Sequence, residues 1–126
     1  MKKIINSNKA PKPIGPYSHS VKASGTFLYI SGQIPLNING ELVGDEIKLQ
    51  TKQVLNNIDA ILNEAGLKAD NVIKTTVLLE NMNDFDAMNE VYSQYFSKSK
   101  PARAAYQVVK LPKEVLVEIE TIAVFD

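Results

Sequence analysis

The chain has 126 residues, of which 44% are hydrophobic and 22% charged, and its formal net charge is zero. This length and composition predict a single globular domain over residues 1–126. Zero net charge argues against a protein that holds a phosphate backbone, so no nucleic-acid partner is expected. Without cysteine, the chain has no disulfide, thiolate nucleophile or zinc–thiolate site.

No targeting or membrane-spanning segment is recognisable. The N-terminus MKKIINSNKAP lacks the apolar run of a signal peptide, and no apolar stretch approaches the roughly 20 residues that span a membrane. We therefore expect a cytoplasmic protein that does not contact the membrane.

The first third of the chain predicts strands and turns. Residues 10–25, APKPIGPYSHSVKASG, contain three prolines and two glycines, which fit neither a regular helix nor a central strand. A β-rich run follows at residues 26–30 and ends at Ser31-Gly32. The dipeptide Asn39-Gly40 then predicts a hairpin turn.

Helical periodicity begins near Asp45. Apolar residues recur there at helical spacing and form one stripe: Ile47, Val54, Leu55, Ile58, Ile61 and Leu62. Gly66 is placed to end this helix as a C-cap. A second helix is predicted to begin at the N-cap Asn83 and to end before Pro101. Its apolar side is formed by Phe85, Met88, Tyr92, Tyr95 and Phe96.

Residues 72–79, 103–109 and 115–124 predict three further strands, the last two joined by a corner at residues 111–113. The order β-β-β-α-β-α-β-β predicts an α+β fold with one mixed sheet of about six strands. Two helices cannot cover both faces of such a sheet, so we expect both on one face. In the final strand the alternate residues on the other side mix charge with Ile and Val, as subunit interfaces do.

Arg103 is the only arginine of the chain; every other basic side chain except His19 is a lysine. Arginine differs from lysine in its planar fork of five donors, which matches a carboxylate or phosphate bidentately. One interpretation is therefore an anion site. The other is that a composition rich in lysine happens to retain one arginine.

An antiparallel pairing of the last two strands would place Arg103 on one face with Glu118 or Glu120. In that arrangement, Arg103 would hold a substrate carboxylate and Glu118 would position water or a substrate nitrogen. The alternative is a structural ion pair across neighbouring strands, which contributes little when exposed.

The other candidates are weaker when taken singly. His19, the only histidine, is a possible general base, although an exposed loop histidine is the more frequent case. Tyr17 follows Gly15-Pro16 and could line a cleft or pack a turn. Ser31 and Gly32 could offer a hydroxyl and a bare N–H to an anion, or end a strand. Asn89 lies near the apolar side of the second helix. The acidic residues of that helix fit no metal loop, and no metal site is expected.

Five segments occur in an order and at separations typical of one family: APKPIGPYSHSV, SGQIP, VIKTTVLLENMNDFDAMNEVYSQYF, KPARAAYQVVKLP and VEIETIAV. Through them the chain resembles the reactive intermediate deaminase A (RidA) family, also called the YjgF/YER057c/UK114 family, over nearly its whole length. No single segment is specific, but five in register are.

The resemblance implies a chorismate-mutase-like α+β fold assembled as a homotrimer, with the sheets inside and three clefts between neighbouring subunits. It implies hydrolysis of short-lived 2-imino acids, formed from enamines such as 2-aminoacrylate, to 2-keto acids and ammonia. This is the reaction of a 2-iminobutanoate/2-iminopropanoate deaminase, a hydrolase acting on C=N bonds. The family reaction uses no metal or organic cofactor.

The resemblance also assigns roles to residues. Arg103 in PAR matches the arginine that holds the substrate carboxylate, and Glu118 in VEIE matches the acidic residue near the attacking water. The positions that match cleft-lining residues are Tyr17 in GPYS, Ser31 and Gly32 in SGQ, and Asn89 in MNEVY. Many active members have cysteine where this chain has Ala105; that position chiefly contributes backbone, so activity is expected to survive. We expect Glu118 and Tyr17 of one cleft to belong to different subunits.

The sequence leaves three other functions open, one of which, a holdase-like chaperone, has no specific feature in its support. The same intersubunit clefts could form a small-ligand module that binds 2-keto acids without turnover, since fold does not fix function. RNA cleavage, attributed to some relatives, fits poorly with zero net charge and a single arginine.

Overall fold

The computed structural model describes all 126 residues. The order of elements from residue 26 onward confirms the predicted strand, helix, strand, helix and two strands, but the strands at residues 2–5 and 20–23 were not predicted and the arms of the predicted Asn39-Gly40 hairpin form none. The elements are β1 (Lys2–Ile5), β2 (Ser20–Ala23), β3 (Thr26–Gln33), α1 (Ile47–Glu64), β4 (Val72–Leu79), α2 (Phe85–Phe96), β5 (Ala102–Gln107) and β6 (Val117–Phe125). Short 3₁₀ turns precede β4, α2 and β6 at Ala69–Asn71, Met82–Asp84 and Pro112–Glu114.

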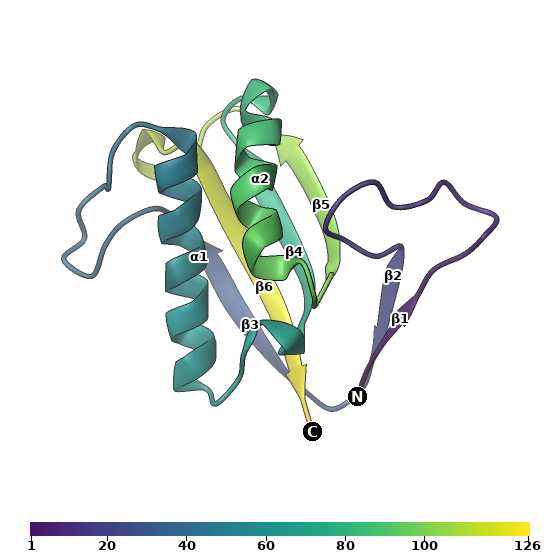
Figure 1. Ribbon diagram of the computed structural model, residues 1–126. Coiled ribbons are helices and arrows are strands. Elements are labelled where there is room, and N and C mark those ends of the chain that lie inside the picture. Colours follow the sequence, from purple (N-terminus) through teal and green to yellow (C-terminus); the bar gives the residue numbers. More distant parts are fainter.

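The structure has six strands, as predicted, but they divide between two sheets instead of forming a single one. Four of them form a mixed sheet in the order β3-β6-β4-β5, in which only β4 and β5 are parallel. The other two, β1 and β2, pair antiparallel as a separate ribbon. A long loop between β1 and β2 projects from the body of the molecule (Figure 1). This loop contains the proline-rich stretch, which the sequence excluded from central strands.

Both helices cover one face of the four-stranded sheet, as predicted (Figure 1). The α1 stripe is buried at Val54, Leu55, Ile58 and Leu62, and α2 contributes Met88, Tyr92 and Phe96 to the same core. The sheet supplies alternate residues from β4 and β6, which is the period of a strand with one covered face. The opposite face of the sheet carries no element of this chain (Figure 1).

The helix ends show one predicted cap and one correction. Gly66 has φ +75°, and the amides of Gly66 and Leu67 donate to the carbonyls of Asn63 and Leu62, a Schellman ending for α1. Asn83 is not the N-cap of α2. A 3₁₀ turn lies ahead of the helix, so the N-cap position of α2 is Asp84, which makes no side-chain capping bond. The Asn81 side chain caps the 3₁₀ turn instead and accepts the Asn83 amide at 2.9 Å.

The predicted hairpin at Asn39-Gly40 is present as a turn, but its two arms make almost no strand pairing. Gly40 has φ +77°, but only the bridge between Leu36 and Leu42 pairs the two arms. The Asn37 side chain accepts the amides of Asn39 and Glu41, which replaces further backbone pairing.

The predicted pairing of the last two strands is wrong. Between β5 and β6 lies β4, which pairs parallel with β5 and antiparallel with β6. The connection through α2 makes a β-α-β unit, whose parallel strands lie side by side. The chain then passes over the end of β4 before β6 begins.

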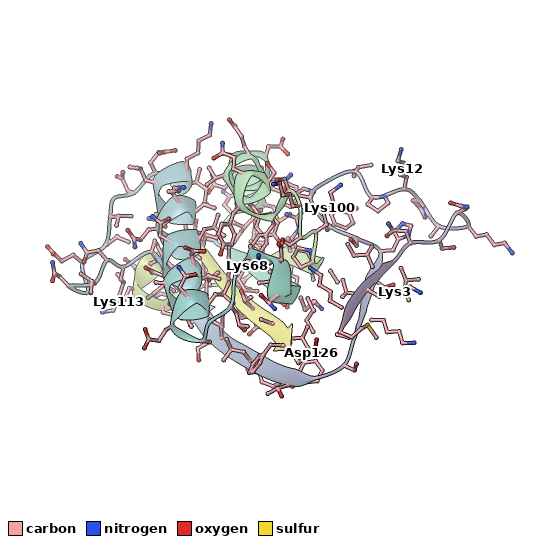
Figure 2. All side chains as sticks on the ribbon, turned by 60° about the horizontal axis from the view of Figure 1, so that its bottom comes forward. Lys3, Lys12, Lys68, Lys100, Lys113 and Asp126 are labelled. Atoms are coloured by element: carbon pink, nitrogen blue, oxygen red, sulfur yellow. The ribbon has the colours of Figure 1, made fainter.

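The two ends of the chain meet. The Met1 amine lies 2.7 Å from the Asp126 carboxylate, at the same end of the molecule as the start of β1 (Figures 1 and 2). None of the helices has the length and apolar character needed to cross a membrane.

Candidate functional site

Arg103 lies on the covered face of the sheet, not on the open one. Its register partner on β4 is Thr75, which points toward α2. The prediction that Arg103 shares a face with Glu118 is therefore wrong for a single chain. Glu118 is the register partner of Leu78, which points to the opposite face of β4 from Thr75, so the two side chains lie on opposite faces of the sheet.

Three aromatic rings surround the half-buried Arg103 guanidinium. Its central carbon lies 4.7 Å from the ring centroid of Tyr92, 5.4 Å from that of Phe85 and 5.5 Å from that of Tyr17. Such contacts stabilise a cation while excluding water from part of its surface. We call Arg103 together with Tyr17, Phe85, Asn89 and Tyr92 the arginine cluster.

The only hydrogen bond of the Arg103 side chain joins Nη1 to the Asn89 Oδ1, at 2.6 Å. No carboxylate lies within ion-pair distance: the ion pairs of the chain involve Met1, Lys48 and Lys68. Burial lowers the pKa of the guanidinium, and the nearby phenols of Tyr92 and Tyr17 oppose that change. The arginine thus carries its charge without an anionic partner and has donors free on its other edge.

Tyr92 forms the floor of the arginine cluster. Its hydroxyl shares a hydrogen bond of 2.7 Å with the Thr75 Oγ1 in the core. Burial raises the pKa of Tyr92 to about 12, so the ring remains a neutral phenol beneath the cation. The partner hydroxyl fixes the plane of the ring, and the ring in turn limits how Arg103 can tilt.

Tyr17 reaches the cluster from the loop between β1 and β2. The Tyr17 amide donates to the Gly15 carbonyl at 2.8 Å, which closes a tight turn. A Cβ at Gly15 would lie 3.3 Å from the Tyr17 ring and 3.7 Å from the Nη2 of Arg103. The glycine therefore allows the loop to approach the arginine closely.

Glu118 lies on the open face, where it covers Gly32. Its register partner on β4 is Leu78, and a Cβ at Gly32 would overlap its carboxylate. The β3–β6 register shifts between Ile30 and Gln33, so Ser31 and Gly32 form the irregular segment. We call Glu118, Glu120, Ser31 and Gly32 the glutamate face.

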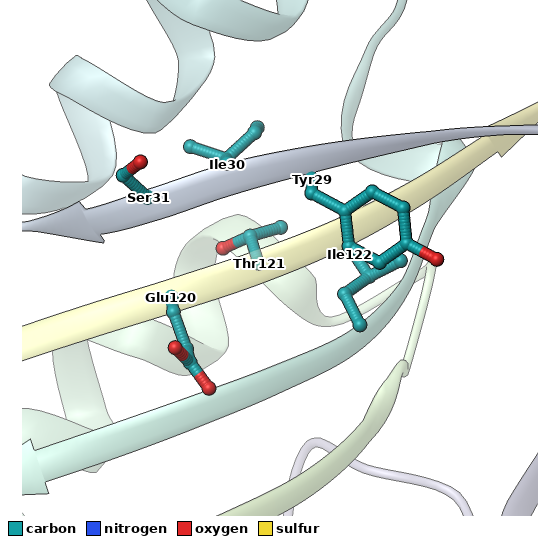
Figure 3. Close-up of a pocket in the computed structure, with 6 residues that line it drawn as sticks. All are labelled: Tyr29, Ile30, Ser31, Glu120, Thr121 and Ile122. Atoms are coloured by element: carbon teal, nitrogen blue, oxygen red, sulfur yellow. The ribbon is translucent and has the colours of Figure 1, made fainter.

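Burial raises the pKa of Glu118, and the neighbouring negative charge of Glu120 adds to this effect. Beside these residues is a hollow of about 240 Å³, lined by Tyr29, Ile30, Ser31, Glu120, Thr121 and Ile122 (Figure 3). The Tyr29 side chain extends along this face and is 73% exposed. The open face thus combines carboxylates with an uncovered aromatic surface.

The structure divides the predicted site residues into two groups. Arg103, Tyr17 and Asn89 meet in the arginine cluster, and Ala105 follows on the same face, packed against the core. Glu118, Ser31 and Gly32 gather on the glutamate face. Sequence reasoning did not identify Phe85 and Tyr92 as neighbours of Arg103. Their spacing with Asn89, at residues 85, 89 and 92, was a helical signal that could have indicated it.

His19 has a structural environment. Its Nδ1 accepts the Ser7 amide at 3.0 Å, and its Nε2 contacts the Pro11 carbonyl, so the ring ties the loop to the end of β1. The ring is half-buried rather than fully exposed. No three His, Asp or Glu side chains gather closely enough to hold a metal ion.

Known proteins resemble this chain along almost its whole length. A family profile described as Endoribonuclease L-PSP matches residues 7–125. A RutC family protein of Pyrococcus horikoshii is 59% identical over 124 residues, 98% of each chain. The 2-iminobutanoate/2-iminopropanoate deaminase of Mus musculus is 51% identical over 125 residues, covering 98% of this chain and 92% of the mouse protein.

Solved structures agree with these sequence matches. E. coli TdcF with bound serine superposes with a TM-score of 0.75 at 41% identity, covering 98% of this chain and 99% of that one. The fold, the matched profile and these relatives together lead to one assignment. This chain is a member of the reactive intermediate deaminase (Rid) family, also called the YjgF family.

Proposed function

We propose that this protein is a 2-iminobutanoate/2-iminopropanoate deaminase, which hydrolyses reactive imines to 2-keto acids and ammonia. The mammalian relative carries this name at 51% identity. The observation that carries the proposal is Arg103, a half-buried cation held by neutral groups, with no carboxylate as partner. Such a cation suits an anionic ligand, and a 2-imino acid presents one carboxylate.

Substrate binding follows from this geometry. The free donors of Arg103 would grip the carboxylate in two bonds, while Asn89 holds the opposite edge of the fork. The rings of Tyr17, Phe85 and Tyr92 keep part of the site dry, which strengthens the charge-assisted bonds. Ser31, Gly32 and Ala105 would line the cleft.

Hydrolysis then needs water and a proton carrier. Water adds to the C=N carbon and gives a carbinolamine; its collapse forms the C=O bond and releases ammonia. Glu118 would orient the water, accept its proton, or pass a proton to the leaving nitrogen. Orientation and one acid–base contact contribute several powers of ten in rate. No cofactor enters this scheme.

One chain cannot complete such a cleft, because Arg103 and Glu118 lie on opposite faces of its sheet. We propose that a homotrimer brings the arginine cluster of one subunit to the glutamate face of the next. The exposed side chains of Phe27, Tyr29 and Tyr106 support an association through the open face.

The alternative is a module that binds 2-keto acids or amino acids in the same clefts without turnover. The relative TdcF was solved with serine, an intact amino acid. Ala105 stands where many active members have cysteine, which also keeps this alternative open. RNA cleavage, suggested by the description of the matched profile, has less support because the only arginine is half-buried among aromatic rings.

The test is a coupled assay in which a threonine or serine dehydratase generates the enamine and 2-keto acid formation is followed. The parent protein is expected to accelerate keto-acid formation, and Arg103→Ala is expected to abolish the acceleration. Arg103→Lys keeps the charge but not the fork, so we expect at least a tenfold loss, the equivalent of about one charge-assisted bond.

Lys113→Ala is the matched control, because it removes a positive charge from the turn before β6, outside the arginine cluster. Its activity should equal that of the parent. An inactive but folded parent that binds 2-ketobutyrate would favour the binding module. Near-parental turnover by Arg103→Lys would refute the argument from the arginine fork.

A further inference from the structure

A second cavity includes Gly15 and Tyr17, which also lie beside Arg103. Its volume is about 260 Å³, and its lining residues come from β1, the β1–β2 loop and the turn after α2: Ile4, Asn6, Lys12, Pro13, Gly15, Tyr17, Ser18 and Lys100. This volume is below the 300–1,000 Å³ of typical drug-sized ligand sites. It suits a small ligand.

The lining of this cavity contains basic residues and no acidic ones. Lys12 and Lys100 belong to it, and no Asp or Glu does. The Oδ1 of Asn6 already accepts the His19 amide at 2.8 Å, which leaves the NH₂ group of Asn6 for a ligand. Neither lysine belongs to an ion pair of the chain. A lining with two unpaired lysines and no carboxylate favours an acceptor-rich ligand that carries negative charge.

The charge around the cavity is not balanced locally. The first 40 residues contain five lysines and no acidic residue, although the whole chain is neutral. Lys3, Lys12 and Lys100 all lie on the side of the molecule that carries the β1–β2 loop (Figure 2). An anion approaching this side therefore meets a positive potential.

Both lysines extend from fixed backbone. Lys12 lies between Pro11 and Pro13, which restrict its conformation, and the Pro11 carbonyl contacts the His19 ring. Lys100 has φ +41°, a left-handed conformation that favours glycine at the end of a helix. The buried Ser18 hydroxyl donates to the Lys100 carbonyl at 2.7 Å and fixes this turn. A lysine retained where glycine would be less strained is a reason to look for function.

We propose that this cavity binds a small phosphate-class anion, either inorganic phosphate or the phosphate group of a small ester. Lys12 and Lys100 would neutralise its charge, and the Asn6 NH₂ and the Tyr17 hydroxyl would complete the shell. Gly15 and Tyr17 form a wall shared with the arginine cluster. The proposal does not depend on the imine reaction.

The test is a ¹H–¹⁵N NMR titration of the full chain with inorganic phosphate and, separately, with glycerol phosphate, at constant ionic strength. We expect saturable shifts at the amides of Asn6, Gly15, Ser18 and Lys100, with a millimolar dissociation constant. Tighter binding of the ester would identify a phosphomonoester as the ligand, and equal binding would identify free phosphate. Both results support the site.

Two variants and one control locate the anion. Lys12→Gln and Lys100→Gly should each weaken binding by about fivefold, the upper end of what an exposed charge contributes. Lys100→Gly also relieves the left-handed strain, so its lost binding cannot be attributed to unfolding. Lys22→Gln removes a lysine from β2 that does not line the cavity, and it should leave the affinity unchanged.

Arg103 is a nearby alternative anion site, so the titration is repeated on Arg103→Ala. The shifts at Asn6, Ser18 and Lys100 should persist in that variant. Three results would each overturn the proposal. They are loss of these shifts in Arg103→Ala, an equal loss of phosphate affinity in Lys22→Gln, and shifts in the parent that rise linearly without saturating.

Discussion

Neutral groups stabilise Arg103, so its charge is not neutralised by an anionic side chain of the same molecule. Asn89 holds one edge of the guanidinium, and Tyr92 supports its face through the bond to Thr75. An acidic partner in this position would compete with a substrate carboxylate. Asparagine at residue 89, unlike aspartate, leaves the guanidinium without an anionic partner.

The two carboxylates of the glutamate face influence one another. Burial raises the pKa of Glu118 above its ordinary 4.5, and Glu120 raises it further. If Glu118 acts as a base in hydrolysis, it must be deprotonated, so activity should fall as pH decreases through this raised pKa. Glu120→Gln removes a like charge, lowers the pKa of Glu118 and should move the acid limb to lower pH.

The measurement is the pH–rate profile of imine hydrolysis for the parent, Glu120→Gln and Glu118→Gln. Glu114→Gln, in the turn before β6, is the matched control and should leave the profile unchanged. An acid limb that stays in place in Glu120→Gln would show that another group titrates.

At the scale of elements, one feature of the sheet positions each group of site residues: a register shift for the glutamate face and a parallel crossover for the arginine cluster. The register shift in β3 turns Gly32 toward Glu118, and the absence of a Cβ leaves room for the carboxylate. The parallel crossover through α2 brings Asn89 over Arg103, since β5 lies beside β4 and under this helix. Regular strands with a simple hairpin would have produced neither arrangement.

The 3₁₀ turn before β6 contains avoidable strain. Lys113 and Glu114 are consecutive non-glycine residues with φ of +54° and +56°. A left-handed conformation costs a side-chain-bearing residue about 1–2 kcal/mol, partly offset by the greater unfolded-state freedom of glycine. Glu114→Gly should therefore raise the free energy of unfolding by about 1 kcal/mol.

Urea denaturation followed by circular dichroism measures this change. Lys110→Gly, in the same loop but without positive φ, should instead lower stability slightly. Equal effects of the two glycines would mean that the turn is not strained.

At the scale of the whole molecule, the arginine cluster and the glutamate face are separated by the sheet itself. A shared cleft predicts complementation between subunits that each lack one group. In trimers assembled randomly from equal amounts of Arg103→Ala and Glu118→Gln, about one cleft in four receives both parental residues. Mixed trimers should thus recover about a quarter of parental activity.

Arg103→Ala mixed with Tyr17→Phe is the control, because those residues meet within one chain. That mixture should not exceed the mean activity of the two separate variants. Mixed trimers of Arg103→Ala and Glu118→Gln that remain inactive would contradict the shared cleft.

The sequence by itself determined the class of fold and the order of elements from residue 26 onward, and it drew attention to Arg103 as the only arginine. Periodicity is a local signal, so the buried stripes of α1 and α2 could be identified, as could the C-cap at Gly66. The glycine and proline content of residues 10–25 likewise excluded regular structure from most of that stretch. These features depend on neighbours along the chain.

Only the tertiary structure decided which residues meet. Strand pairing is non-local, and the insertion of β4 between β5 and β6 placed Arg103 and Glu118 on opposite faces. A shift of one residue in strand alternation reverses the direction of every side chain, so the face of Arg103 could not be read from its strand alone. The same long-range contacts decided that Phe85 and Tyr92 surround Arg103, and that Lys12 and Lys100 share a cavity.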